Sequence, residues 1–537
     1  MASAAMIQHP NLGTVRGKAA EDSSGVTQFL GVKYATLKDR FALPELVKGD
    51  PKGAVEAGEF GPQVVSVHGA LDMEMGYIQQ TLPKPPNLPS SSDTEGLNLN
   101  ITVPPAGTPK PPDGFPVLAF IHGGALSVGA NWWPQYDFKR LVKFGSETGR
   151  PFIGVNIGYR LGIPGFLTSA EMQKAGYKPN NGLRDQATAL QWIKHHISGF
   201  GGNPESVAVM GESAGAASAL LHLQSPTPLF ARIISMSGTP LMMKPLPPPV
   251  AEHTYATVLD AFNLAHLSPP DRLHALRTLP IPDLLSKAPL GAPLIFVEDG
   301  DSVRASPSHA DLQPSLAPAA GTWCTELLSG WCGADANIMA YLLPALQGPD
   351  VARLFTASFG KSLDATHPGL AAKVLGAYAI EAGAGAQEAL PRIVELASDL
   401  LFRASARAYV DAWPGSGQGR AWLYDFEMKN PWEGRWKGYA THILDVAAFF
   451  LNFEEKLPSE GYGERAREWA GDVLDFVVGN GAGWDAEREV RVFKEDGHAI
   501  VKKEEEVRGD KLSGILKDEG VGFDVLAEAW GNFMQGK

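Results

Sequence analysis

One serine in this 537-residue sequence stands in a setting that indicates chemistry. Ser213 is the centre of the pentapeptide 211–215, G-E-S-A-G, which follows the apolar, strand-like run 206–210 and precedes the small-residue run 216–220. A strand that turns sharply into a helix at G-x-S-x-G holds its serine in a strained conformation with the hydroxyl exposed, and only glycine leaves room on either side. The pattern predicts a nucleophile at a strand-to-helix elbow.

A second glycine motif lies upstream. His122, Gly123, Gly124 and Ala125 directly follow the apolar run 116–121. A serine hydroxyl is a weak nucleophile unless a base takes its proton and donors stabilise the oxyanion. Hydrolases with this elbow place backbone N–H groups after a strand that ends in an HGG-type sequence. A glycine turn after a buried strand is the alternative, and the downstream pentapeptide disfavours it.

Further motifs resemble the type-B carboxylesterase and cholinesterase family of α/β-hydrolases. The matching segments are 29–35 (FLGVKYA, near the family's F-x-G-I-P-Y-A), 97–100 (LNLN, near L-Y-L-N), 156–167 (near N-Y-R-x-G-x-x-G-F-L) and 181–193 (near N-x-G-L-x-D-Q-x-x-A-L-x-W). The likeness is dense from Leu12 to Gly238 and sparser to about Trp530. The resemblance implies the α/β-hydrolase fold, a large central, mixed but mostly parallel sheet flanked by helices.

The resemblance also supplies two partners for Ser213. The family's acid lies in a G-x-x-x-D-E-G pattern, and segment 327–336 fits it with Asp335 where Glu is usual. The family's histidine lies in an H-x-x-D/E motif, which segment 438–445 matches with His442. His442 would take the serine proton and later pass it to the leaving alcohol, while Asp335 would hold the imidazole and stabilise the imidazolium. The chain order of serine, acid and histidine is that of α/β-hydrolases.

Other acids compete with Asp335 for this role. Glu326 lies close to it in sequence, and the segment 298–301, E-D-G-D, is similar to a family D-G-D segment that we interpret as structural. Because aspartate is one methylene shorter than glutamate, the loop must bring Asp335 closer to His442 than the family's glutamate needs to be.

By the same resemblance, the N–H groups of Gly124, Ala125 and Ala214 form an oxyanion hole. The family usually has a third glycine where Ala125 stands. A backbone N–H of alanine can still donate if its φ is negative, and its methyl would narrow the site against bulky tertiary-alcohol esters. Candidate walls of the acyl site, with core packing as the equal alternative, are Ala125, Leu126, Trp132, Trp133, Leu241, Met242 and Met243.

The elements that must position these residues follow an α/β pattern. Strand-like runs include 152–157, 232–236 and 421–426, and helical patterns include 183–195 and 466–478. Alternating strands and helices predict a sheet covered by helices on both faces. Because the motifs of one catalytic core spread over the chain, we expect residues 1–537 to form a single domain, with helical cap insertions at about 240–290 and 336–415.

Composition and charge limit the kinds of molecule that the protein is expected to bind and the compartment in which it is expected to work. A net charge of −13 argues against nucleic acid and anionic membranes. No apolar run reaches the roughly 18 residues that span a bilayer, and residues 1–10 lack the basic and apolar parts of a signal peptide. The family's secreted members carry disulfides, whereas this chain has only Cys324 and Cys332, so we expect free thiols and a cytoplasmic protein. No metal or dinucleotide motif occurs, and we expect no metal or cofactor.

Three functions are compatible with these observations. The leading one is a soluble serine esterase that cleaves esters of small to medium apolar substrates as a monomer or homodimer. Acetylcholine is disfavoured, because the stretch between Val64 and Gly96 has no Trp for an aromatic cage and only Tyr77. The second uses the same triad for acyl transfer or another non-hydrolytic step in secondary metabolism. The third is an inactive, cholinesterase-like adhesion or scaffold protein, whose expected signs are a lost triad residue and a secretory signal.

Overall fold

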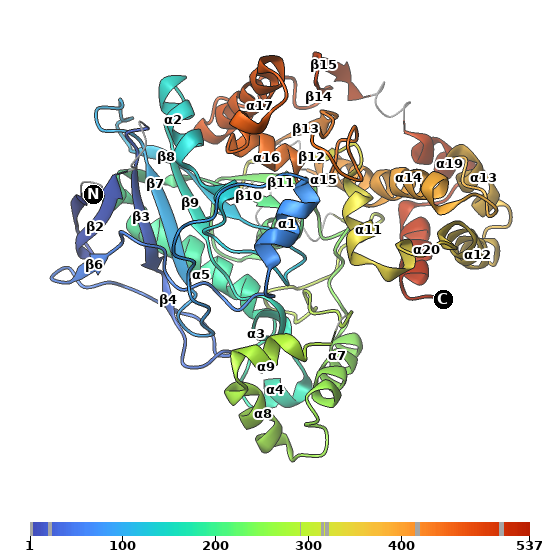
Figure 1. The fold of residues 1–537 in the computed structure, drawn as a ribbon, viewed down its shortest axis with the longest axis horizontal. Helices are drawn as coiled ribbons and strands as arrows, with labels where there is room; N and C mark the ends of the chain where they lie inside the picture. Colours follow the sequence, from blue (N-terminus) through green and yellow to red (C-terminus); the bar gives the residue numbers. More distant parts are fainter. Residues whose placement is uncertain are drawn as a thin grey trace.

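The computed structural model of the chain describes residues 4–19, 24–289, 291–312, 316, 322–413, 419–503 and 510–537. Residues 1–3, residue 290 at the end of the first expected insertion and residues 414–415 at the end of the second lie outside the described residues. Across the described part of the chain runs a 13-stranded sheet in the order β1-β2-β3-β7-β9-β8-β10-β11-β12-β13-β14-β15, with β6 paired to β2 (Figure 1).

The strands of this sheet have the following bounds: β1 Ala4–His9, β2 Gly13–Ala19, β3 Thr27–Lys33, β6 Ala54–Glu56, β7 Asn98–Val103, β8 Phe115–Ile121, β9 Ile153–Ile157, β10 Gly202–Glu212, β11 Arg232–Met236, β12 Glu326–Cys332, β13 Arg420–Phe426, β14 Glu489–Lys494 and β15 Gly497–Lys502. From β9 to β14 the neighbouring strands are parallel. Antiparallel pairs flank this block on both sides. The expected mixed, mostly parallel sheet is therefore confirmed.

The parallel strands are rich in apolar residues, as expected of strands that are covered on both faces of the sheet. Along β8, Val117, Ala119 and Ile121 belong to one hydrophobic core, whereas Leu118 and Phe120 belong to a second. Helices α5 (Asn181–His196) and α6 (Ala214–Leu221) pack in the first core, and α2 (Lys139–Glu147), α16 (Leu444–Phe450) and α17 (Glu460–Val478) pack in the second. The carboxyl ends of the parallel strands thus open between two helical layers.

Residues 240–289 contain three helices. They are α7 (Pro248–Ala261), α8 (Pro269–Thr278) and α9 (Ile281–Ser286), which gather beside α4 (Ala170–Lys174) at the bottom of Figure 1. Polar contacts tie these helices together. Glu171 of α4 accepts a hydrogen bond from Tyr255 of α7 (2.6 Å) and pairs with Arg272 of α8 (3.1 Å).

Residues 336–413 contain several helices too. They include α11 (Met339–Leu342), α12 (Val351–Asp364), α13 (Leu370–Ala377), α14 (Ala386–Ala397), a π-helical turn (Ser398–Arg403) and α15 (Ala404–Ala412). Helix α15 contacts β12 and β13 and so covers the sheet directly. Helix α12 packs on the C-terminal α20 (Phe523–Met534), with the rings of Phe355 and Phe533 5.0 Å apart (Figure 1).

The individual elements expected from the patterns are also found. Strands 152–157, 232–236 and 421–426 correspond to β9, β11 and β13, and helices 183–195 and 466–478 lie within α5 and α17. Among the described residues, no helix combines the length and the apolar character that crossing a membrane requires.

Candidate active site

The elbow is built as its glycines predict. Ser213 lies between β10 and α6 with φ 53° and ψ −121°, a conformation that is strained for any residue with a side chain. A Cβ on Gly211 would come within 2.2 Å of the Gly215 carbonyl oxygen, and a Cβ on Gly215 within 2.1 Å of the Ile121 oxygen. The turn therefore needs glycine on both sides and presents Ser213 at the carboxyl edge of the sheet.

The structure brings Asp335 and His442 together. Oδ1 of Asp335 lies 2.7 Å from Nδ1 of His442, and both side chains are buried. Two contacts between their loops hold this arrangement, since the N–H of Ala334 donates to the Ala440 oxygen (2.8 Å) and that of His442 to the Asn337 side chain (2.9 Å). The other carboxylate oxygen of Asp335 accepts the N–H of Cys332 (2.8 Å). The shorter acid thus reaches the imidazole, as the sequence argument required.

The other ring nitrogen of His442, Nε2, lies beside Glu212, a residue whose role sequence analysis missed. Oε1 of Glu212, the residue before Ser213, lies 3.1 Å from Nε2 of His442, and it is buried. Burial raises the pKa of Glu212 well above its ordinary value. Burial by itself would lower the pKa of His442, but the hydrogen bond that it donates to Asp335 and the charge of Glu212 raise it to about 9. The sequence did carry a signal for Glu212, because an ionisable residue stands at the end of a strand that is buried on both faces.

A second buried carboxyl, Glu74 of α1 (Ala70–Ile78), lies in the same electrostatic neighbourhood. Its Oε1 accepts hydrogen bonds from Gln135 Nε2 (2.8 Å) and from the hydroxyl of Tyr136. Burial raises the pKa of Glu74 to about 7 against the effect of these two donors and of His442. Nothing in the spacing of this helix pointed to the residue, because its partners are about 60 residues away.

The loop after β8 lies directly against the elbow. A Cβ on Gly123 would come within 2.2 Å of Glu212 Oε2 and 3.0 Å of Ser213 Cβ. Ala214 is the first residue of α6, where a helix leaves its N–H groups without intrahelical acceptors. No acceptor among the described residues takes the N–H of Gly124 or Ala125. All three predicted oxyanion donors thus come from segments that flank Ser213.

Ala125 does not have the negative φ that would suit alanine. Its φ is +52°, in the left-handed region, and Gly124 before it has φ +88°. The carbonyl of Gly124 accepts the N–H groups of Ser127 and Val128, each at 3.0 Å. In a trans peptide the N–H points away from the carbonyl, so this turn aims the Ala125 N–H outward whatever its own φ is. The left-handed φ costs about 1–2 kcal/mol for an alanine, but it does not change the direction of the Ala125 N–H.

The rival acids are occupied elsewhere. Glu326 pairs with Arg232 (2.7 Å) and Arg420 at the amino end of β12. Asp299 pairs with Arg184 (2.9 Å) and accepts a hydrogen bond from Asn180. Of the candidate acyl-site walls, Leu126, Trp132 and Trp133 are buried in the hydrophobic cores, whereas Ala125, Leu241, Met242 and Met243 are half-buried.

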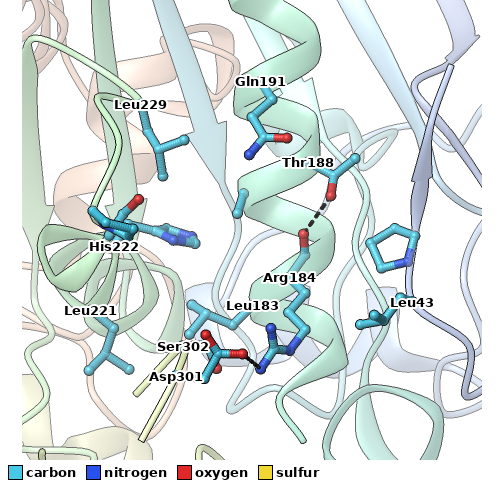
Figure 2. A pocket seen from close by; sticks show the side chains of 14 residues that line it. Leu43, Leu183, Arg184, Thr188, Gln191, Leu221, His222, Leu229, Asp301 and Ser302 are labelled. Atoms are coloured by element: carbon cyan, nitrogen blue, oxygen red, sulfur yellow. Dashed lines mark hydrogen bonds and ion pairs between the residues drawn. The ribbon is translucent and has the colours of Figure 1, made fainter. Parts of the chain in front are cut away.

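A well-formed cavity of about 280 Å³ lies away from these residues, at the far end of α6. Figure 2 shows it between α5 and the His222 turn. Some of its polar groups bind one another, because Thr188 donates to the Arg184 carbonyl (2.9 Å) and Arg184 pairs with Asp301 (3.0 Å). None of Ser213, Asp335 and His442 lines it. Within the described residues, no group of three or more His, Cys, Asp or Glu is placed to hold a metal ion.

Curated relatives match less than half of the chain. A probable N-octanoylanthranilate hydrolase of Rhodococcus erythropolis is 35% identical over 228 residues, which are 42% of this chain and 45% of that protein. A para-nitrobenzyl esterase of Bacillus subtilis is 35% identical over 233 residues (42% of each), and a mouse cholinesterase 36% over 233 (42% and 36%). The matches thus span less than half of the length of each of these relatives.

Solved structures match over almost the whole chain. A PNB esterase has a TM-score of 0.71 at 24% identity and covers 94% of this chain and 99% of its own. A Geobacillus stearothermophilus carboxylesterase has a TM-score of 0.70 at 23% identity and covers 95% and 99%. These likenesses show the α/β-hydrolase fold. The model of the carboxylesterase family matches residues 3–460. This chain therefore belongs to the carboxylesterase family.

Proposed function

We propose that this protein is a serine hydrolase that cleaves carboxylic esters of small to medium apolar substrates. The observation that carries the proposal is the placement of His442, which lies 2.7 Å from Asp335 on one side and 3.1 Å from Glu212, the neighbour of the strained Ser213, on the other. A nucleophile, a base and an orienting acid on three separate loops at one sheet edge are what acyl transfer to serine requires.

In the proposed mechanism, which begins from the neutral form of His442, Ser213 Oγ attacks the ester carbonyl carbon while His442 takes the hydroxyl proton. Asp335 holds the imidazole in the right tautomer and stabilises the imidazolium. The N–H groups of Gly124, Ala125 and Ala214 stabilise the oxyanion. When the tetrahedral intermediate collapses, the bond to the alcohol oxygen breaks and His442 returns the proton to the alcohol. Water then attacks the acyl-serine by the same route and releases the acid.

Glu212 lies beside Nε2, the atom that receives the proton. Burial favours the neutral carboxyl of Glu212, and the positive charge of His442 opposes this by favouring its carboxylate. A buried carboxylate there favours the charged imidazolium over neutral imidazole. It therefore stabilises the state that forms with the tetrahedral intermediate. The names of the relatives, two esterases and a hydrolase, support hydrolysis over acyl transfer.

Ser213→Ala tests the proposal. We expect the variant to stay folded and to lose about 10⁴–10⁶-fold in kcat on p-nitrophenyl butyrate, because the covalent nucleophile is gone. Mass spectrometry should show that a fluorophosphonate adds to Ser213 in the wild-type chain. Ser206→Ala, in the same strand that leads to the elbow, is the matched control and should keep its activity. A Ser213→Ala enzyme with a tenth of wild-type activity would refute the mechanism.

The domain organisation and the setting of the enzyme are also proposals. We infer a single domain over 1–537, with the helices of 240–290 and most of 336–415 as insertions that cap the sheet. Cys324 and Cys332 are both free and buried, which supports a reducing, cytoplasmic location. The small ester is the partner that the site supports, and a monomer or homodimer is consistent with it.

A further inference from the structure

We propose that Tyr159 is a positioning residue of the oxyanion hole, which it aligns through the carbonyl group and the ring of His122. The inference rests on the proposed function, because it concerns how the donors of that site are aimed. It begins with the sheet. Strands β8 and β9 are parallel neighbours, and Ile121 lies opposite Ile157 in their register. His122 and Tyr159 therefore leave the sheet side by side.

Tyr159 contacts His122 in two ways. Its hydroxyl donates to the His122 carbonyl oxygen at 2.7 Å. Its ring stacks on the imidazole with 4.5 Å between the centroids and 24° between the planes. Tyr159 is completely buried, so its position is set by the core and not by solvent. A Cβ on Gly129 would come within 2.1 Å of His122 Nδ1, so the backbone at Gly129 packs closely against the imidazole.

These contacts orient successive peptide groups of the oxyanion loop. Since the C=O and N–H of a trans peptide point in opposite directions, the hydroxyl bond to the His122 oxygen aims the Gly123 N–H away from Tyr159. Nδ1–H of His122 donates to the Gly123 oxygen (3.1 Å), which aims the Gly124 N–H away from the imidazole. The turn at Gly124 then aims the Ala125 N–H, as described above. The orientations of the Gly123 and Gly124 N–H groups therefore depend on His122, which Tyr159 contacts through its hydroxyl and its ring.

The state of His122 fits this role and no proton-transfer role. Burial lowers the pKa of His122 to about 4, so the imidazole is neutral at working pH. Its single proton lies on Nδ1, since a carbonyl oxygen can only accept. Nε2 is buried and has no partner among the described residues. The ring therefore serves as a fixed donor to the loop, and the stacked tyrosine keeps it in place.

Tyr159→Phe is the direct test, because it retains the stacked ring and removes the hydroxyl. Losing one oxyanion donor costs about 10²–10³ in kcat, and misaligning one should cost less. We expect a fall of about 10–100-fold in kcat with KM within twofold. Affinity for a trifluoromethyl ketone, which forms a tetrahedral adduct with serine, should fall in parallel, while affinity for the planar product acid stays unchanged. A merely structural residue would not separate these two ligands.

Tyr462→Phe is the matched control. That tyrosine is also buried and donates to a backbone carbonyl, the Lys429 oxygen (2.9 Å), away from the oxyanion loop. Its removal should leave both kcat and the affinity for the ketone within twofold. Equal losses in both variants, or an unchanged kcat in Tyr159→Phe, would overturn the positioning role. If the wild-type Ser213 still reacts with a fluorophosphonate, such a result leaves the proposed function standing.

A pair of His122 variants keeps the test decisive if Tyr159→Phe does not fold. The side-chain amide of His122→Asn places an N–H near the position of Nδ1, whereas His122→Ala has no donor. We expect His122→Asn to keep at least tenfold more kcat than His122→Ala, at similar KM. Equal activity of the two folded variants would refute the idea that the hydrogen bond to Gly123 aligns the loop.

Discussion

At the residue scale, Asp335 is the acid that we propose for the triad, and it is one methylene shorter than a glutamate. It reaches Nδ1 of His442 at 2.7 Å because a bridge between Ala334 and Thr441 and the Ala334–Ala440 hydrogen bond join the two loops. A glutamate in the same loop would have to fold back or displace the imidazole. The loops, and not the length of the acid, set the distance between acid and base.

Asp335→Asn should therefore leave a folded protein whose imidazole has the wrong tautomer. By analogy with other serine-hydrolase triads, we expect a loss of about 10⁴-fold in kcat. Asp299→Asn is the control, because Asp299 is bound to Arg184 and Asn180 and not to His442. Steady-state kinetics on ester substrates, normalised to folded enzyme, checks both. If Asp299→Asn were the inactive variant and Asp335→Asn nearly normal, Asp335 would not be the triad acid.

Ala125 is a second residue whose proposed role, as an oxyanion donor, depends on the turn formed by its neighbours. Ala125→Gly should raise kcat/KM for tert-butyl esters relative to n-butyl esters by about 10–200-fold, because one or two methyl-sized contacts are worth roughly 1–3 kcal/mol. The φ of +52° adds an expectation for stability. Glycine relieves left-handed strain while adding freedom to the unfolded chain, so the free energy of unfolding should change little. An unchanged ratio of esters would mean that the methyl faces away from the substrate.

At the scale of elements, a buried ion pair joins the loop after β9 to helix α5. Arg160 pairs with Asp185 through two side-chain hydrogen bonds of 2.7 and 2.8 Å, and its remaining donors bind the carbonyls of Arg40 (2.9 Å) and Ala42 (2.8 Å). Both side chains are almost fully buried. Arg160 thus joins the loop after β9, helix α5 and the segment of Arg40 and Ala42. It directly follows Tyr159, the residue that we propose aligns the oxyanion loop.

Asp185→Asn should be strongly destabilising, because it leaves the guanidinium of Arg160 buried without a counter-charge. Breaking one partner of a buried pair costs about 3–5 kcal/mol. Urea unfolding measures the change. Glu147→Gln breaks the exposed pair between Lys143 and Glu147 on α2 and should change the unfolding midpoint little. Similar effects of the two substitutions would show that the Arg160 pair does not hold the loop.

At the scale of the whole molecule, the buried carboxyl of Glu74 links the pH to the stability of the fold. Its pKa in the folded protein is about 7, above its ordinary value of 4.5. Between these two pH values the folded chain holds a proton that the unfolded chain has released. The contribution of Glu74 to the free energy of unfolding therefore falls as the pH rises through this window, and it is lowest above pH 7.

Glu74→Gln should remove this dependence. Because one pKa unit corresponds to about 1.4 kcal/mol, we expect the variant to gain up to about 3 kcal/mol over the wild type between pH 5 and pH 8. The amide oxygen can still accept the bonds from Gln135 and Tyr136. Urea midpoints at the two pH values give the difference, with Glu147→Gln as an exposed control. Parallel pH curves for Glu74→Gln and the wild type would contradict the prediction.

The sequence by itself determined the local parts of the site. Glycine at 211 and 215 has a purely steric cause, and apolar runs of strand length identify the buried strands, so the elbow and strands β9, β11 and β13 were predictable. The motifs around Asp335 and His442 identified two residues that the structure places 2.7 Å apart. These features depend on neighbours along the chain or on patterns that a family shares.

Only the tertiary structure decided what lies around these residues. The contacts of Glu212 with His442, of Glu74 with Tyr136 and of Tyr159 with His122 join segments that are tens to hundreds of residues apart. The positive φ of Ala125 results from the turn that Gly124 forms with Ser127 and Val128, which sequence analysis did not anticipate. Burial, which shifts the pKa values of these groups, is a property of the packed molecule. For that reason, no local pattern in the sequence could supply it.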